Sequence, residues 1–203
     1  MKKVSEKDIM AALDRGEIKF LDDCQIDVNH KLPEGNGDSL LLYAIGNEGN
    51  NSIYKELIAR HADIYAENDL GENIIHSIVF SGDPSRLQYV LTEFPDLIKE
   101  INHQDHDGTT PLLLSILIDK PNLSLQLIDS GADVNIADNN GNAPVHIACW
   151  SGYLDVVKAL VGRGADIFAK TTNGNSPLAL AINQGHTAVA EYLFPLWLKL
   201  NKL

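Results

Sequence analysis

The chain has 203 residues, 44% of them hydrophobic, which is enough apolar material for one or two ordinary domains. Asp and Glu number 28 against 16 Lys and Arg, so the formal net charge is −12. This acidic balance argues against nucleic acids and anionic membrane surfaces as partners, because both attract a positive face.

The sequence also indicates in which cellular compartment the protein is found. Cys24 and Cys149 are too few for a disulfide framework and indicate reduced thiols. The first residues, Met1–Asp8, lack the apolar stretch of a secretory signal, and no apolar run reaches the roughly 18 residues of a membrane span. We therefore expect a cytoplasmic protein, or one in the cytosol of a host cell if it is a secreted effector.

Two short motifs recur along the chain. The first reads GDSLL at 37–41, GENII at 71–75, GTTPL at 108–112, GNAPV at 141–145 and GNSPL at 174–178. Its last three copies are 33 residues apart, and the earlier spacings are 34 and 37. The second, GADVN at 131–135, returns 33 residues later as GADIF, with weaker copies that begin at Gln25 and His61. A fixed period of this length indicates an array of similar structural units.

Each copy predicts the same local structure. A polar residue that can cap a helix comes first, at Ser39, Asn73, Thr110 and Ser176. Proline follows in the later copies, at the helical position where its missing N–H costs nothing. Apolar residues at helical spacing lead to a glycine, at Gly49, Gly82, Gly152 and Gly185, and a second helix follows. Gly164 suits a left-handed position after that second helix.

Helix, turn, helix and hairpin at a period of 33 resemble the ankyrin repeat. The family motif T-P-L-H-x-A is similar to residues 110–115, 143–148 and 176–181. The resemblance runs from about Ser5 to about Leu193 and implies an all-α solenoid of about six helix-turn-helix units joined by short hairpins. We expect a single domain, 1–203, with units at about 4–33, 34–68, 69–105, 106–138, 139–171 and 172–203, of which the terminal ones are divergent caps.

The chain departs from the family pattern in three places. Asp119 replaces the glycine between two helices, and Asp tolerates a left-handed backbone. Residues 91–98 replace the Gly-Ala-Asp loop of the third unit. The apolar tail from Phe194 to Leu203 is expected to fold back as a cap, with Pro195 breaking the preceding helix. The alternative is a tail that forms a dimer contact in an otherwise monomeric protein.

No catalytic, metal or cofactor site is expected. The resemblance implies that His76 and His146 bond the backbone between units. The cluster of His103 and His106 with their neighbouring aspartates is interpreted as a solvated turn rather than a metal site. Cys149 lies near His146 but at a position that the family keeps small and buried, so we expect a packed thiol and not a nucleophile. The sequence thus predicts a protein that is not an enzyme.

The resemblance implies a scaffold that binds another protein through its concave face, as an adaptor, an inhibitor or a secreted effector. Two alternatives stay open. One is the regulatory subunit of an enzyme. The other, also implied by the resemblance, is the substrate of an asparaginyl hydroxylase. In similar repeats the modified asparagine follows a leucine by eight residues and an acid by two, as Asn135 and Asn29 do. A structural asparagine that bridges the hairpin is the competing interpretation of both residues.

The family resemblance also implies which residues face the partner. Positions seven and eight after the helix cap contribute Phe80, Leu117, Ile118, Trp150 and Asn183. The hairpins contribute a polar rim, which comprises Asp69, Glu72, His106, Asp107, Asn139, Asn140, Asn142, Thr172 and Asn173. Exposed apolar side chains and tryptophan in particular are typical of binding hot spots. The alternative for Trp150 is that it packs on its neighbours and stiffens the stack.

Overall fold

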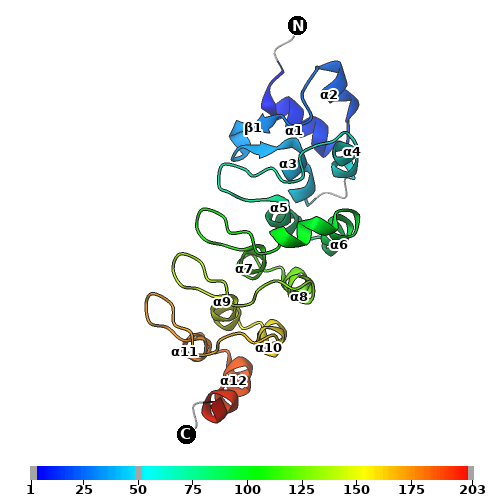
Figure 1. The fold of residues 1–203 in the computed structure, drawn as a ribbon. Coiled ribbons are helices and arrows are strands. Elements are labelled where there is room, and N and C mark those ends of the chain that lie inside the picture. Colours follow the sequence, from blue (N-terminus) through cyan, green and yellow to red (C-terminus); the bar gives the residue numbers. More distant parts are fainter. Residues whose placement is uncertain (1–3, 49–51, 201–203) are drawn as a thin grey trace. The chain divides into compact units, whose positions relative to one another are not determined.

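The computed structural model describes residues 4–48 and 52–200, and these residues form pairs of helices joined by hairpins (Figure 1). The chain divides into two compact units, Met1–Pro95 and Asp96–Leu203, and each is described by itself. The all-α ankyrin-type architecture predicted from the sequence is confirmed. The expected single domain and its six boundaries stay predictions.

The N-terminal unit begins with α1 (Glu6–Asp14) and α2 (Lys19–Asp23). Strands β1 (Lys31–Leu32) and β2 (Asp38–Ser39) pair antiparallel around a 3-10 turn at Pro33–Gly35, with Lys31 opposite Ser39. The helices α3 (Leu40–Gly46), α4 (Ile53–Ala59), α5 (Ile74–Ser81) and α6 (Pro84–Glu93) follow. Helix α3 packs on α5 and α4, which makes it the centre of this unit.

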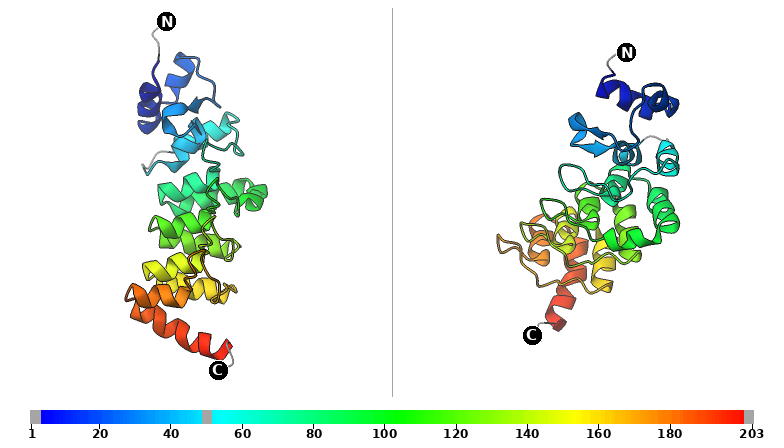
Figure 2. Two further views of the ribbon diagram at one scale, coloured as in Figure 1. Left: turned by 90° about the vertical axis from the view of Figure 1, so that its left-hand side faces the viewer. Right: turned by 45° about the horizontal axis from the view of Figure 1, so that its top comes forward.

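The C-terminal unit follows a 3-10 segment, Pro95–Glu100, that begins at the division. Its helices are α7 (Pro111–Leu117), α8 (Pro121–Asp129), α9 (Pro144–Ser151), α10 (Leu154–Gly162), α11 (Pro177–Asn183) and α12 (Thr187–Leu200). Within this unit α7, α9 and α11 form one layer and α8 and α10 a second (Figures 1 and 2). The loops before α7, α9 and α11 project away from the second layer.

Local capping chemistry explains where the first helices begin. The side chains of Ser39, Thr110 and Ser176 each accept a hydrogen bond from the backbone amide three residues on, at 3.2, 3.2 and 3.3 Å. Asn73 Oδ1 accepts from the amides of Ile75 and His76, two and three residues on, at 3.0 and 3.2 Å. Such a cap stabilises a helix by about 1 kcal/mol. All four predicted caps are therefore confirmed.

The turns between helices also follow the prediction. Gly82, Gly152 and Gly185 adopt φ values of 68°, 78° and 77°, in the left-handed region that glycine enters without steric cost. Asp119 takes the same conformation, with φ of 59°, and its carboxylate accepts a hydrogen bond from Tyr153 Oη at 2.7 Å. The predicted glycine turn at position 49 lies outside the described residues.

A buried histidine ties α9 to the hairpin that follows α10. The Nδ1 atom of His146 accepts from the amide of Ala143 at 3.1 Å, so the ring proton resides on Nε2 and is donated to the carbonyl of Ala169 at 3.0 Å. Burial lowers the pKa of His146, which favours this neutral form. His146 bonds the backbone as predicted, but Ala143 and Ala169 both lie in its own predicted unit, 139–171, so these bonds do not join two units.

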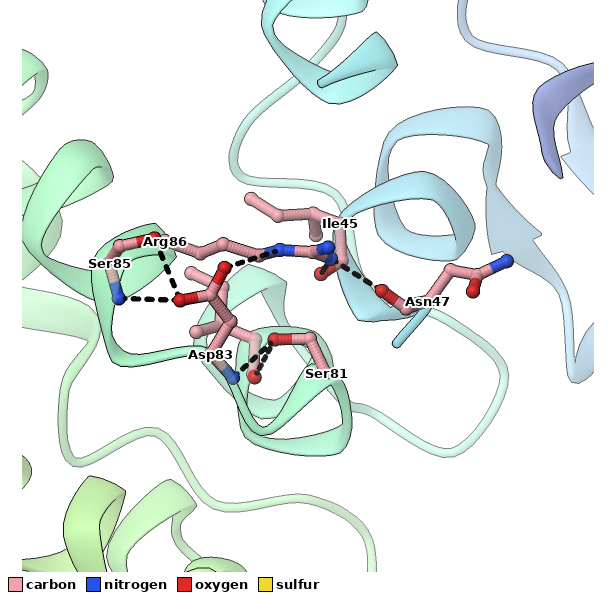
Figure 3. Close-up of polar contacts among 7 residues, drawn as sticks. Ile45, Asn47, Ser81, Asp83, Ser85 and Arg86 are labelled. Atoms are coloured by element: carbon pink, nitrogen blue, oxygen red, sulfur yellow. Dashed lines mark hydrogen bonds and ion pairs between the residues drawn. The ribbon is translucent and has the colours of Figure 1, made fainter. Parts of the chain in front are cut away.

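A buried arginine closes the C-terminal end of α3 (Figure 3). Arg86 on α6 is 2% exposed, and its Nη1 donates to the carbonyls of Ile45 and Asn47, both at 2.6 Å. Its Nε lies 3.5 Å from a carboxylate oxygen of Asp83, and its guanidinium lies 5.4 Å from the ring of Tyr54. The last carbonyls of a helix have no partner within the helix. Arg86 supplies one from the next helix pair.

The prediction of a helix break at Pro195 is wrong. Helix α12 continues through this residue to Leu200. A proline removes one helical hydrogen bond, but Val189, Leu193 and Trp197 recur every fourth residue and keep one apolar side of α12 continuous. Val189 and Leu193 are buried, and the ring of Trp197 lies 6.3 Å from that of Phe168. The tail therefore extends the last helix instead of folding back, and residues 201–203 lie outside the described part.

Candidate protein interaction surface

We define the inner face of each compact unit as its hairpin tips together with the last turn of its first-layer helices. In the C-terminal unit this face carries Leu117 on α7 and Trp150 on α9, which are 50% and 52% exposed. Each follows a fully buried residue, Ile116 and Cys149, respectively. Since α7 and α9 pack side by side, the two exposed side chains occupy the same position on neighbouring helices.

Other residues predicted for this face divide by exposure. Asn183 takes the equivalent position on α11 and is exposed, whereas Ile118 is half-buried. Position eight after the cap is inward on α5, where Ser81 is buried and its hydroxyl donates to the carbonyl of Ile78 at 2.6 Å. Position seven, and not position eight, is thus the main outward site of the repeat.

In the N-terminal unit the inner face is formed by α3, α5 and their hairpins. Phe80 on α5 is 40% exposed, and Leu70 at the adjoining hairpin is 45% exposed. A continuous row from Phe80 to Leu117 would cross the division between the compact units, so that row stays a prediction. The two inner faces are considered separately below.

Backbone hydrogen bonds join successive hairpin tips within each unit. The amide of Asp69 donates to the carbonyl of Asn36 at 2.8 Å in the N-terminal unit. In the C-terminal unit Asn139 donates to Asp107, and Thr172 donates to Asn140, both at 3.0 Å. The exposed tip residues are Asp69, His106, Asp107, Asn139, Asn140, Thr172 and Asn173. These residues agree with the exposed rim expected from the sequence.

Glu72 and Asn142 do not belong to an exposed rim, which corrects their predicted placement. Glu72 is buried, and its carboxylate accepts from Asn68 Nδ2 at 2.7 Å. Asn142 is half-buried, and its side chain donates to Asp138 at 2.9 Å. Glu72 lies four residues after Asn68, and Asn142 lies four residues after Asp138. The backbone amides of Glu72 and Asn142 donate to the Oδ1 atoms of Asn68 and Asp138, at 3.0 and 2.8 Å, and these bonds close the two hairpins. This closure turns them toward the hairpin stem.

The asparagines predicted as modification sites form bridges between hairpins. Asn29 Oδ1 accepts from the amide of Asp63 at 2.8 Å, and Asn135 Oδ1 accepts from the amide of Asp166 at 2.9 Å. Asn102 makes the equivalent bond to Asp133 at 2.8 Å. Both candidate residues thus have a structural role, and their hydroxylation stays a prediction.

The described residues contain no group of three His, Cys, Asp or Glu side chains arranged to hold a metal ion. Cys149 is buried, and burial raises the pKa of its thiol to about 12, so that the nucleophilic thiolate is suppressed near neutral pH. None of the helices in residues 4–48 and 52–200 is both long and apolar enough to cross a membrane.

Sequence reasoning missed a hollow on the inner face of the N-terminal unit. It measures about 330 Å³, and its lining includes Asp38, Tyr43, Gly46 and Leu70 besides the predicted Glu72 and Phe80. The signal available in the sequence was Gly46, which stands seven residues after the Ser39 cap, where the next three repeats carry Phe80, Leu117 and Trp150.

Capped helix pairs, left-handed turns and bonded hairpin tips define a helical repeat protein. Two family models match the chain: ankyrin repeats (3 copies) over residues 75–171 and ankyrin repeats (many copies) over residues 151–194. Together they cover more than half of the 203 residues. The chain belongs to the ankyrin-repeat family, whose repeats are general protein–protein interaction modules. No curated protein matches the chain.

Proposed function

We propose that this protein binds a partner protein through its inner faces and has no catalytic role of its own. The observation that carries the proposal is the exposure of Leu117 and Trp150 at one position of two adjacent helices whose other apolar residues are buried or half-buried. An exposed tryptophan beside a second large apolar residue is typical of an interface centre. The polar tips of the same hairpins supply the wet rim that surrounds such a centre.

A photo-crosslinking amino acid placed at position 150 tests the proposal. Cross-linked partner, identified by mass spectrometry after affinity capture, is expected from position 150. The matched control is position 158 on α10, a second-layer lysine whose side chain is 49% exposed, and no cross-link is expected there. Equal cross-linking from both positions would mean that the inner face is not the binding surface.

A second test separates binding from stability. The double variant Trp150→Ala with Phe80→Ala removes one exposed aromatic side chain from each inner face. Truncation of an interface tryptophan costs about 2 kcal/mol or more of binding energy. We expect weaker partner binding and an unchanged melting temperature. A large drop in melting temperature would instead support the view that Trp150 stiffens the stack.

The finer role is that of an adaptor, an inhibitor or a secreted effector, and the identity of the cross-linked partner decides among them. If the partner is an enzyme, the protein is its regulatory subunit. A cytosolic site of action is consistent with the two free thiols, Cys24 and Cys149.

The substrate role is tested by incubation with an asparaginyl hydroxylase, which should add one oxygen at Asn135 or Asn29. If the protein gains no mass under conditions in which a control repeat is modified, the hydroxylase-substrate hypothesis is wrong.

A further inference from the structure

The hollow in the N-terminal unit exists because α3 and α5 approach closely at a glycine. A Cβ atom placed on Gly46 would lie 3.1 Å from the carbonyl oxygen of Ser77 on α5. A larger residue at this position would require the neighbouring backbone to move by a few tenths of an ångström. The surface that Phe80, Leu117 and Trp150 fill in later repeats is therefore open at Gly46, and the resulting space of about 330 Å³ is suited to one long side chain.

The walls of the hollow are apolar on one side. Leu42 and Tyr43 on α3, Leu70 at the hairpin and Phe80 on α5 contribute to the lining. Leu70 and Phe80 are 45% and 40% exposed, so they still offer apolar surface to a ligand. An aromatic ring beside the space also provides a face on which a planar cation can stack.

Two carboxylates from successive hairpins complete the lining. Asp38 and Glu72 share the side-chain amide of Asn68, which donates to Asp38 at 2.9 Å and to Glu72 at 2.7 Å. This amide holds the two acids side by side, and both acids line the hollow. Burial raises the pKa of Asp38, and the nearby charge of Asp69 adds to this effect. The attraction of a cation in the space would offset both effects, because a nearby opposite charge favours the ionised carboxylate.

We infer that this hollow is an anchor site for an arginine side chain of the partner protein. The aliphatic stem would lie between Leu70 and Phe80, and the guanidinium would reach Asp38 and Glu72. Charge complementarity selects a cation, which agrees with the net charge of −12. The planar fork of arginine can donate to two neighbouring carboxylates at once, which the point charge of lysine does less well. The inference rests on the proposed function, since it names the chemistry that one inner face recognises.

The test uses a short peptide with a single arginine between serines, and the same peptide with citrulline. Citrulline keeps the shape of arginine and removes its charge. Binding to the full chain is followed by NMR through the backbone amides of Gly46, Leu70 and Phe80. We expect the arginine peptide to shift these amides and to bind at least ten-fold more tightly than the citrulline peptide. A lysine peptide should bind more weakly than the arginine peptide.

The matched protein variants remove the charge on the acid side. Asp38→Asn together with Glu72→Gln should weaken arginine binding at least ten-fold. Asp155→Asn, at an acid on α10 whose side chain is 86% exposed, should leave it unchanged. If the double variant does not fold, the comparison of arginine with citrulline on the unaltered protein still decides.

Three results would overturn the inference: equal binding of the citrulline peptide, tighter binding of the lysine peptide, or shifts that map away from the hollow. If one of these results is obtained while specific cross-linking at position 150 is retained, only the arginine anchor is refuted. Loss of the cross-linking result would remove the proposed function as a whole.

Discussion

Replacement of Arg86 by methionine tests how far the N-terminal unit depends on one buried cation. Methionine keeps most of the apolar stem and removes the guanidinium. Two charge-assisted hydrogen bonds to the carbonyls of Ile45 and Asn47 are lost, each worth about 1.5–3 kcal/mol. Part of this is returned, because the charge no longer has to be buried. We expect a net loss of about 3 kcal/mol in the free energy of unfolding.

The effect can be localised with two probes of urea unfolding. Far-UV circular dichroism reports on all helices, whereas both tryptophans, Trp150 and Trp197, belong to the C-terminal unit. Stability in repeat proteins is a sum of local terms, so Arg86→Met should lower the dichroism midpoint more than the fluorescence midpoint. The control is Arg163→Met, which removes a half-exposed ion pair worth about 0–1 kcal/mol. A dichroism midpoint no lower than that of the control would refute the reasoning.

Three further predictions follow from the C-terminal unit. The folded-state pKa of His146 lies below its ordinary value of 6.5, so the stability contributed by the neutral ring is complete above pH 6.5 and declines as the pH falls. Unfolding measured from pH 7 to 5 should show this decline, and His146→Gln should reduce it. Native protein treated with iodoacetamide should be labelled at the half-exposed Cys24 and not at Cys149, whose thiol has a pKa of about 12; equal labelling would contradict the packing described. Truncation after Phe194 should lower the melting temperature, because it removes Trp197 from the last helix; an unchanged melting temperature with lost self-association would favour the dimer contact.

Features of the fold set by neighbours in sequence were predictable. A cap such as Thr110 acts on an amide three residues away, and the left-handed turn at Asp119 depends on one residue type. The continuation of α12 through Pro195 was not predictable. The local preference of proline to end a helix competes there with apolar packing along the whole helix. The balance depends on residues such as Val189 and Leu193, whose burial is known only from the three-dimensional arrangement.

Some features of the candidate surface were likewise predictable from the sequence, and others were not. The family resemblance was enough to predict that Trp150 and Leu117 are exposed. It was not enough for Glu72, because the bond that turns this residue inward comes from a hairpin whose geometry the motif does not encode. The hollow at Gly46 depends on the distance between two helices and on two hairpins that supply one acid each. No single repeat contains that information.

The bonds between successive hairpin tips are made by main-chain atoms, as between Asn139 and Asp107 or between Asp69 and Asn36. These main-chain bonds do not depend on which side chains the tips carry, although Asn139 Nδ2 and Thr172 Oγ1 add side-chain bonds to the carbonyls of His106 and Asn140, at 3.1 and 2.9 Å. Substitutions there can alter what is recognised while the register of the recognising elements is kept. The hairpins of this protein thus offer sites for combinatorial diversification, and variants selected against a new target should retain the melting behaviour of the parent.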